Sequence, residues 1–260
     1  MTRFTEHDPG TFSWADLGTT DPADAQRFYG ELFGWEMIDD PSEEHGTYTF
    51  CFIDDDPIVT LHQTGQEASA ATTPRWTPYV TVEDVDQSAK TAAALGGTVV
   101  VEPIDMNDSG RTAMVQDPTG AVIALWKARE IIGAQRMSEP RTLTRFELLT
   151  PVTDGAAAFY QGLFGWTTRS RKKGRRPYAL FMAGGRFRGG MMAPQPALEE
   201  LSPAWLVSFE ADDCDALARR AVGLGATLTV PPRDISGAGR AALLTDPQGA
   251  PFSIITSARS

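Results

Sequence analysis

An internal repeat limits the fold of this 260-residue chain more than any other feature. The phrase FYGELFGWE at 28–36 returns as FYQGLFGWT at 159–167, an offset of 131 residues. GRTAMVQDPTGA at 110–121 returns as GRAALLTDPQGA at 239–250, an offset of 129 residues. Because both offsets are close to half of the chain, the sequence predicts two copies of one domain and not a solenoid of short repeats.

Each copy is long enough to bury a hydrophobic core of its own. We place the first domain at residues 1–133, the second at 141–260, and a linker at 134–140. The linker lies within EIIGAQRMSEPR, between the last predicted strand of one copy and the first predicted strand of the next.

The same order of elements is predicted in each copy. In the first copy a strand at 11–19 precedes a helix at 22–33, which Thr20 or Asp21 caps and Gly34 ends. The apolar residues of this helix share one face, so the helix is expected to pack on a sheet. Stretches with the composition of β-strands follow, and then the order of strand, helix and strands begins again. The sequence therefore predicts an α+β protein with two βαβββ units in each copy and four in all.

The two copies differ most in a segment that follows the repeated phrase. After Trp35 the first copy has the acidic EMIDDPSEEH, and after Trp166 the second has the basic TTRSRKKGRR. We expect both segments to be solvated turns that keep exposed sheet edges from pairing. Alternatively, the opposite charges steer an anionic ligand toward the second copy or attract one segment to the other.

Composition argues against several classes of partner. The net charge of −11 disfavours binding to nucleic acid and to anionic membranes, because both require clustered Lys and Arg. The sequence has no apolar run of about 18 residues and no signal-peptide pattern, so we expect a cytoplasmic protein. Cys51 and Cys214 lack the number and spacing of a disulfide framework or a zinc site, and we expect them to be buried apolar groups.

Three motifs in a fixed order carry a family resemblance. FY…LFGW at the end of the first helix, an acidic start of the next helix (EDVD or DDCD) and a closing D-P-x-G occur in both copies. Together they resemble the vicinal oxygen chelate superfamily, which includes glyoxalase I, bleomycin-resistance proteins and extradiol dioxygenases. The resemblance covers nearly the whole chain and is greatest to the tandem two-domain glyoxalase-like subgroup. It implies that paired βαβββ units curl into a half-open barrel whose concave face, the cup, holds the ligand.

The resemblance also implies where a divalent metal would be bound. The family's first ligand lies fourteen residues before the FY pair, its last lies seven residues beyond the Asp of D-P-x-G, and another lies on the first strand of the second unit. The corresponding positions in this sequence are Trp14, Thr77, Ala124, Arg145, Leu206 and Ser253. Trp, Ala and Leu cannot coordinate a metal, and a cationic Arg repels one. His7, His45 and His62 do not cluster in the sequence. We therefore predict that the protein binds neither a metal nor another cofactor.

Two carboxylates are the candidate catalytic groups. Strand alternation puts Asp16 on the face of Trp14, and Glu147 on the face of Arg145, so one carboxylate is expected in each cup. Each is a candidate general acid or base, and the alternative is a structural ion pair with a nearby arginine. The candidate ligand-binding residues are Trp14, Trp76, Tyr79, Met114, Arg145, Trp205, Ser208 and Ser253. For the aromatic members the alternative is ordinary core packing.

Three hypotheses for the function remain open at this point. The first is a metal-independent protein of the bleomycin-resistance kind, which binds a small aromatic or apolar metabolite in a cup. The second is a cofactor-free lyase, isomerase, cyclase or hydroxylase-type tailoring enzyme, in which Asp16 or Glu147 transfers a proton. The third is an interaction scaffold whose cups bind nothing. Because two copies in one chain can pair as two subunits do, we expect a monomer or a weak homodimer.

Overall fold

The computed structural model describes residues 3–42, 46–64, 73–171, 178–194, 196–201 and 203–258. The first half of the chain contains β1 (Phe12–Thr19), α1 (Pro22–Phe33), β2 (Glu36–Ser42), β3 (Gly46–Ile53), β4 (Asp56–Gln63), β5 (Arg75–Thr81), α2 (Val85–Ala94), β6 (Thr98–Met106), β7 (Gly110–Gln116) and β8 (Val122–Ala128). The second half contains β9 (Leu143–Leu149), α3 (Thr153–Phe164), β10 (Thr167–Arg171), β11 (Tyr178–Ala183), β12 (Arg186–Met192), the 3₁₀ helix η1 (Pro196–Leu201), β13 (Ala204–Glu210), α4 (Cys214–Gly223), β14 (Thr227–Ile235), β15 (Gly239–Thr245) and β16 (Pro251–Ser257).

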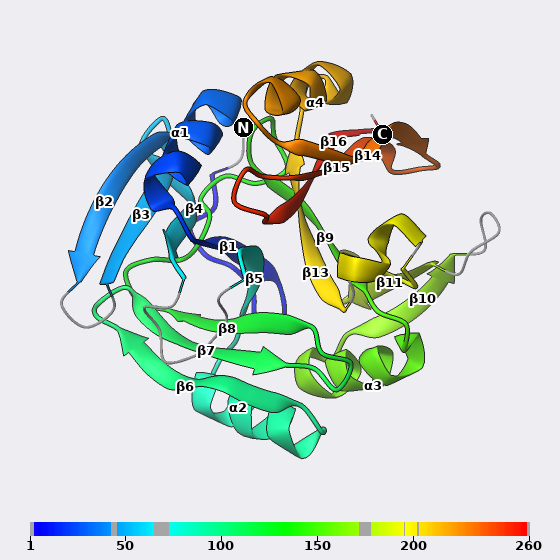
Figure 1. Cartoon of the computed structure of the whole chain (residues 1–260). Coiled ribbons are helices and arrows are strands. Elements are labelled where there is room, and N and C mark those ends of the chain that lie inside the picture. The colour runs from blue at the N-terminus through cyan, green and yellow to red at the C-terminus, as the bar shows by residue number, and fades with distance from the viewer. Residues whose placement is uncertain are drawn as a thin grey trace.

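Each half forms one eight-stranded sheet, and the two sheets have the same topology (Figure 1). The strand order is β2-β3-β4-β1-β5-β8-β7-β6 in the first sheet and β10-β11-β12-β9-β13-β16-β15-β14 in the second. In the first sheet β1 runs parallel to β4 and β5 runs parallel to β8, so each βαβββ unit is closed by a parallel pair. The predicted α+β class and the four βαβββ units are confirmed.

The sequence signals at the ends of α1 act as predicted. The Asp21 side chain accepts a hydrogen bond from the Asp24 backbone N–H, and Pro22 is the first helical residue. Gly34 has φ of 69° and ends the helix in the left-handed conformation, which costs glycine little. The buried face of α1 contains Phe28, Tyr29, Leu32 and Phe33.

The acidic segment after Trp35 differs from the prediction. Residues 36–42 are not a turn but the edge strand β2, paired antiparallel with β3. Most of its side chains are exposed, so charge replaces hydrophobic burial along this edge and disfavours pairing with another sheet. The basic segment of the second copy begins as the edge strand β10, and its positions 172–176 lie outside the described residues.

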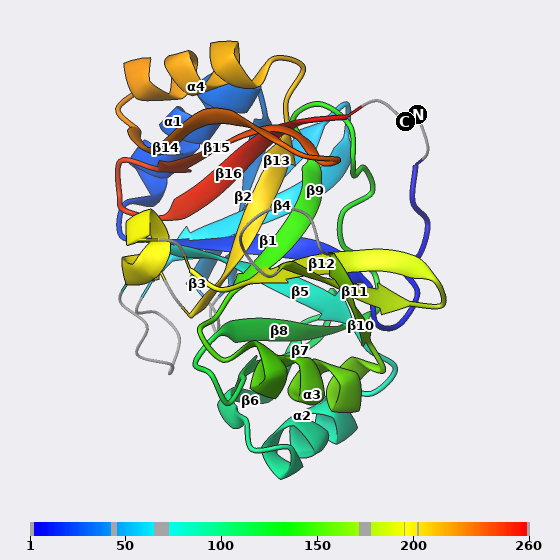
Figure 2. The same ribbon diagram turned by 90° about the vertical axis from the view of Figure 1, so that its right-hand side faces the viewer.

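The two copies share one hydrophobic core, which lies between the sheets. Phe12 of the first copy stacks on Phe146 of the second, with ring centroids 4.1 Å apart. In both views α1 lies beside α4 and α2 lies beside α3, so each helix neighbours one from the other copy (Figures 1 and 2). The interface repeats the contacts of one copy in the other, as a two-fold related dimer would.

The repeated motifs meet across this interface. The Tyr29 hydroxyl of the first FY pair donates to Asp246 Oδ2 in the second D-P-x-G at 2.9 Å, and Tyr160 donates to Asp117 Oδ2 at 2.9 Å. The other carboxylate oxygen of each Asp accepts backbone N–H groups of its own turn. Burial raises the pKa values of both tyrosines well above their ordinary value and raises the pKa of Asp246. Each D-P-x-G therefore both shapes a turn and joins the two copies.

The tryptophans of the two FGW phrases make an equivalent pair of contacts. Trp35 Nε1 donates to the Arg141 carbonyl at 2.9 Å, and Trp166 Nε1 donates to the Gly10 carbonyl at 2.8 Å. Arg141 and Gly10 each precede the first strand of the opposite copy. The phrase that is repeated in the sequence is thus the interface between its two copies.

The predicted linker lies between the two sheets along the chain and packs on the first. Ala134 is fully buried and donates its backbone N–H to the Ser13 carbonyl. Arg136 pairs with Asp54 at 2.7 Å and also with Glu139. Within the described part of the chain, no helix is long and apolar enough to cross a membrane.

Candidate ligand-binding cavities

Strand alternation gives each sheet two faces with different roles. In β1 the side chains of Ala15 and Leu17 are buried in the shared core and line neither cavity, whereas Trp14 packs against the core and also lines a cavity. The equivalent alternation in β9 sends Phe146 and Leu148 into the core, and Arg145 and Glu147 to a second cavity. In the described part of the chain, each copy therefore has a cavity on the sheet face that points away from the shared core.

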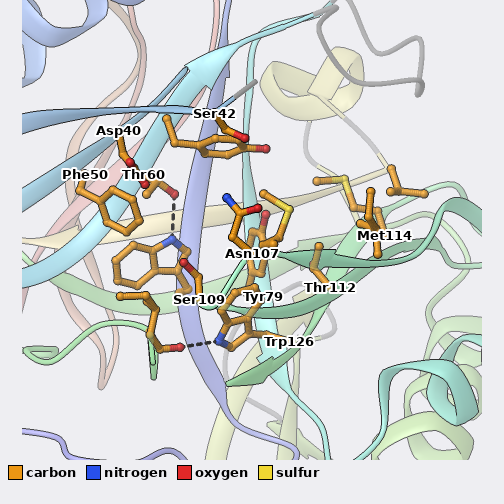
Figure 3. A pocket seen from close by; sticks show the side chains of 17 residues that line it. Asp40, Ser42, Phe50, Thr60, Tyr79, Asn107, Ser109, Thr112, Met114 and Trp126 are labelled. Carbon is orange, nitrogen blue, oxygen red and sulfur yellow. Dashed lines mark hydrogen bonds between the residues drawn. The ribbon is translucent and has the colours of Figure 1, made fainter. Parts of the chain in front are cut away.

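The first cavity has a volume of about 500 Å³ and is lined mostly by aromatic and aliphatic side chains (Figure 3). Trp14 from β1, Tyr79 from β5 and Trp126 from β8 come from the central strands. The remaining apolar lining residues are Phe50, Val101, Ile104, Met106, Met114 and Ile131. A cavity of this size and composition is typical of sites for small organic molecules.

The polar atoms of the cavity's two tryptophans are already engaged. Trp14 Nε1 donates to Thr60 Oγ1 at 2.9 Å, and Trp126 Nε1 donates to the Ile131 carbonyl at 2.9 Å, as the dashed lines in Figure 3 show. The indole rings thus offer the cavity apolar surface without an unpaired N–H. Exposed polar side chains that line the cavity include Asp40 and Asn107, so the first cavity has an apolar wall and a partly polar rim with one carboxylate, Asp40.

Asp16 does not line the first cavity, although alternation places it on the predicted face. Its side chain is 1% exposed, and its Oδ2 accepts from the Tyr79 hydroxyl at 3.4 Å and lies 2.9 Å from His62 Nδ1. Asp16 Oδ1 is buried without a hydrogen-bond partner among the described residues. Asp16 therefore does not contact the first cavity directly, and Tyr79 lies between its carboxylate and the cavity.

The second cavity has a volume of about 310 Å³ and a different chemistry. Arg145 and Glu147 from β9, Tyr178 from β11, Ser208 from β13 and Ser253 from β16 are its principal polar lining residues. The aliphatic lining includes Leu149, Met192, Leu198, Leu206, Val230 and Ile235. Arg233 and Ser236 also line it, so the wall is partly charged and polar and otherwise aliphatic, with the aromatic ring of Tyr178.

Of the two predicted catalytic carboxylates, Glu147 is the one that lines a cavity. Its Oε1 accepts from the Tyr178 hydroxyl at 2.9 Å and from Arg145 Nε at 3.4 Å, and its Oε2 is buried without a partner among the described residues. Burial raises the pKa of the Glu147 carboxyl, against the opposing effects of Arg145 and the Tyr178 hydrogen bond. Burial and the charge of Glu147 raise the pKa of Tyr178 in turn.

Trp76 and Trp205 lie elsewhere than predicted. Trp76 Nε1 donates to the Tyr29 hydroxyl at 3.0 Å, and Trp205 Nε1 donates to the Tyr160 hydroxyl at 2.8 Å. Both rings belong to the shared core and neither lines a described cavity, because their strand positions alternate with those of Tyr79 and Ser208. The alternative of core packing holds for these two tryptophans, whereas Trp14, Tyr79, Met114, Arg145, Ser208 and Ser253 all line cavities.

Comparison with known proteins shows to which family this chain belongs. The sequence profile of the Glyoxalase/Bleomycin resistance protein/Dioxygenase superfamily matches residues 11–125, and that of the Glyoxalase-like domain matches residues 146–255. The protein named "Putative glyoxylase CFP32" from Mycobacterium tuberculosis is 36% identical over 260 residues, with 99% of each chain covered. The chain belongs to the glyoxalase/bleomycin resistance protein/dioxygenase superfamily.

Further relatives extend over nearly the whole chain. The anthracycline biosynthesis protein DnrV of Streptomyces peucetius is 34% identical over 275 residues, which covers 98% of this chain and 95% of that protein. The Mn(II)-bound glyoxalase from Novosphingobium aromaticivorans shares the fold with a TM-score of 0.66 at 16% identity, covering 98% of this chain and 83% of that chain. An extradiol ring-cleaving dioxygenase from B. fuscum matches with a TM-score of 0.67 at 15% identity, over 100% of this chain and 75% of the other.

The residues of this superfamily member do not fit the metal site that the superfamily implies. The strand register aligns Trp14, Tyr79 and Ala124 across β1, β5 and β8, and Arg145, Ser208 and Ser253 across β9, β13 and β16. Thr77 and Leu206, predicted at the middle positions, instead pair with Asp16 and Glu147. Neither row offers three side chains of the kind that bind a divalent metal. Among the described residues, no three His, Cys, Asp or Glu side chains converge.

Several cavity residues were missed by the sequence analysis of this glyoxalase-like chain. Trp126 lies two residues beyond Ala124 and so shares its face, a signal that alternation offers. Phe50 and Tyr48 alternate in β3 in the same way. Tyr178 and His62 are different, because their importance depends on contacts with Glu147 and Asp16 from other strands.

Proposed function

We propose that this glyoxalase-like protein binds a planar, apolar aromatic metabolite in the first cavity without the help of a metal. The observation that carries the proposal is the wall formed by Trp14, Tyr79 and Trp126, in which both indole N–H groups are engaged inside the protein. Flat ring faces without unpaired donors favour stacking with an aromatic ligand. The Asp40 carboxylate on the rim favours a neutral or cationic ligand over an anion.

One relative is consistent with a ligand of this class. DnrV is named for anthracycline biosynthesis, and anthracyclines contain a planar polycyclic ring system. This supports a polycyclic aromatic compound as the first probe to try. The metal-independent part of the proposal depends on the row of Trp14, Tyr79 and Ala124, whose side chains do not provide a metal-ligand set.

The test uses the position of the six tryptophans. Trp14 and Trp126 line the first cavity, whereas Trp35, Trp76, Trp166 and Trp205 line neither described cavity. Titration with an anthracycline is expected to quench tryptophan fluorescence in the wild type and not in the Trp14→Phe, Trp126→Phe double variant. Calorimetry then measures the affinity independently of fluorescence. Equal quenching in the double variant, or no binding heat for any planar polycyclic probe, would refute the proposal.

A second candidate function is favoured by Glu147 alone. Its carboxyl lines the second cavity, has a raised pKa, and has one oxygen without a described partner, which suits a general base. This candidate is a cofactor-free isomerase-type reaction that starts with transfer of a proton from a substrate carbon to Glu147. Deuterium exchange of the α-protons of a 2-oxo acid in D₂O, followed by NMR, tests it. Exchange at the same rate with the Glu147→Gln variant would exclude Glu147 as the base.

An interaction scaffold whose cups bind no ligand is not favoured, because both copies have open cavities large enough for a small molecule. We further propose that the chain acts without a second copy. The contacts through which two subunits would pair are already made between the two halves, as the reciprocal Tyr29–Asp246 and Tyr160–Asp117 bonds illustrate. A molar mass near 28.2 kDa in size-exclusion chromatography with light scattering is expected, and a mass near twice that value would contradict it.

A further inference from the structure

The two cavities differ in charge, although they occupy equivalent places in the two sheets. The central row of the first cavity is Trp14, Tyr79 and Ala124, whereas the row of the second includes the cation Arg145. A guanidinium stays protonated at all physiological pH values, so its charge requires an anionic partner or water. The second cavity therefore has a cation in its wall, which a neutral aromatic ligand of the kind proposed for the first cavity would not pair with.

Arg145 has hydrogen-bonding capacity that the protein leaves unused. Its Nε contacts Glu147 Oε1 at 3.4 Å, a long distance for a charge-assisted hydrogen bond, and its Cζ lies 5.0 Å from the centroid of the Phe187 ring. The side chain is 19% exposed. The Tyr178 hydroxyl is a second hydrogen-bond partner of the guanidinium. A guanidinium has five N–H donors, so donors remain that can bind a carboxylate side by side.

Two serines lie beside Arg145 in the same row. Ser208 pairs in register with both Arg145 and Ser253, and both hydroxyls line the cavity. Ser253 Oγ donates to the Ala242 carbonyl at 2.9 Å, whereas Ser208 Oγ has no hydrogen-bond partner among the described residues. A hydroxyl next to a guanidinium supplies the further donor that a carboxylate oxygen accepts.

Glu147 does not neutralise this cation fully. Its closer hydrogen bond comes from Tyr178, and burial favours the protonated form of its carboxyl. Most of the remaining wall is aliphatic, from Leu149, Met192, Leu206 and Ile235 among others, with the exposed Arg233 and Ser236 beside it. A ligand that satisfies the whole cavity therefore needs one acidic head group and an aliphatic body.

We propose that the second cavity binds an aliphatic carboxylate, whose head group is held by Arg145 and Ser208 and whose chain is enclosed by the aliphatic wall. The site is separate from the first cavity, so the proposal does not depend on the aromatic ligand. Hydrogen bonds to charged groups are the strong ones in proteins, and most of the specificity is assigned to the guanidinium. The aliphatic wall contributes affinity that grows with the length of the chain.

Calorimetry with the whole chain and sodium octanoate tests the proposal. Octanoate is expected to bind at least tenfold more tightly than 1-octanol, which has the same chain length without the charge, and more tightly than acetate, which has the charge without the chain. Arg145→Gln is expected to weaken octanoate binding tenfold or more. Arg219→Gln removes the same charge from the exposed surface of α4 and is expected to leave octanoate binding unchanged.

Two further variants keep the test decisive if Arg145→Gln unfolds. Ala241→Leu adds volume to the cavity wall without removing a hydrogen bond and is expected to abolish octanoate binding. Glu147→Gln removes a competing carboxylate and is expected to bind octanoate as tightly as the wild type or more tightly. The proposal is overturned if octanol binds as well as octanoate, if folded Arg145→Gln binds like the wild type, or if Glu147→Gln loses as much affinity as Arg145→Gln.

Discussion

Removal of the Tyr160 hydroxyl is expected to destabilise both copies together. In the folded protein this hydroxyl donates to Asp117 Oδ2 at 2.9 Å and accepts from Trp205 Nε1 at 2.8 Å, and Tyr160 is fully buried. Tyr160→Phe keeps the ring and its packing but leaves two buried polar groups without a partner. Each costs about 1–3 kcal/mol, so we expect the free energy of unfolding to fall by about 2–6 kcal/mol.

The change is measured by denaturant unfolding and by calorimetry. For a chain of this length each kcal/mol lowers Tm by roughly 2–4 °C, so a decrease of roughly 4–24 °C is expected. Because the core spans both sheets, the transition is expected to move as a whole and not to split into two. A loss below about 0.5 kcal/mol, which is typical of surface substitutions, would refute the idea that these bonds join the copies.

A double-mutant cycle supplies the matched control. Trp205→Phe removes the donor that Tyr160 accepts from, so Tyr160→Phe and Trp205→Phe together are expected to cost less than the sum of the single losses. Tyr29→Phe breaks the equivalent bonds on the other side of the interface, to Trp76 and Asp246. Tyr29→Phe shares no hydrogen-bond partner with Trp205→Phe, and their losses are expected to add.

Three further predictions concern the cavities. Burial raises the pKa of Glu147, so the folded state binds the proton more tightly than the unfolded state. The stability of the wild type relative to Glu147→Gln is therefore expected to rise as the pH falls through the raised pKa toward 4.5. Urea unfolding of both proteins across that pH range measures the difference. A stability difference that is independent of pH would contradict the prediction. An added Cβ at Gly110 would lie 2.5 Å from the Trp126 ring. Gly110→Ala is therefore expected to cost about 1–3 kcal/mol of stability and to weaken aromatic binding in calorimetry. The control Gly223→Ala, with open space around the added Cβ, is expected to do neither. Dialysis against EDTA, checked by metal analysis, is expected to leave the affinity for the aromatic probe unchanged, and a loss restored by a divalent ion would contradict the metal-independent proposal.

The fold could be predicted from the sequence because its signals are local. Asp21, Pro22 and Gly34 set the ends of α1 through backbone geometry and short-range hydrogen bonds. The strand at 36–42 was missed, since its charged residues lack the alternation that burial imposes on an interior strand.

The candidate site was predictable only in part, because alternation fixes a face and not what covers it. It placed Trp14, Arg145 and Glu147 correctly on cavity walls. It also placed Asp16 on that face, where His62 and Tyr79 from other strands enclose it. Such contacts depend on which strands are neighbours in the sheet.

The sequence by itself determined the duplication, the class of most elements and the residue types at the positions where the superfamily implies metal ligands. Only the tertiary structure decided that the Tyr of each FY pair bonds to the D-P-x-G of the other copy. It also decided that Trp76 and Trp205 serve the shared core, whereas Trp126 lines a cavity. The physical reason is that local backbone preferences depend on neighbouring residues, whereas the hydrogen-bond partners of a buried polar group depend on packing between segments far apart in the chain.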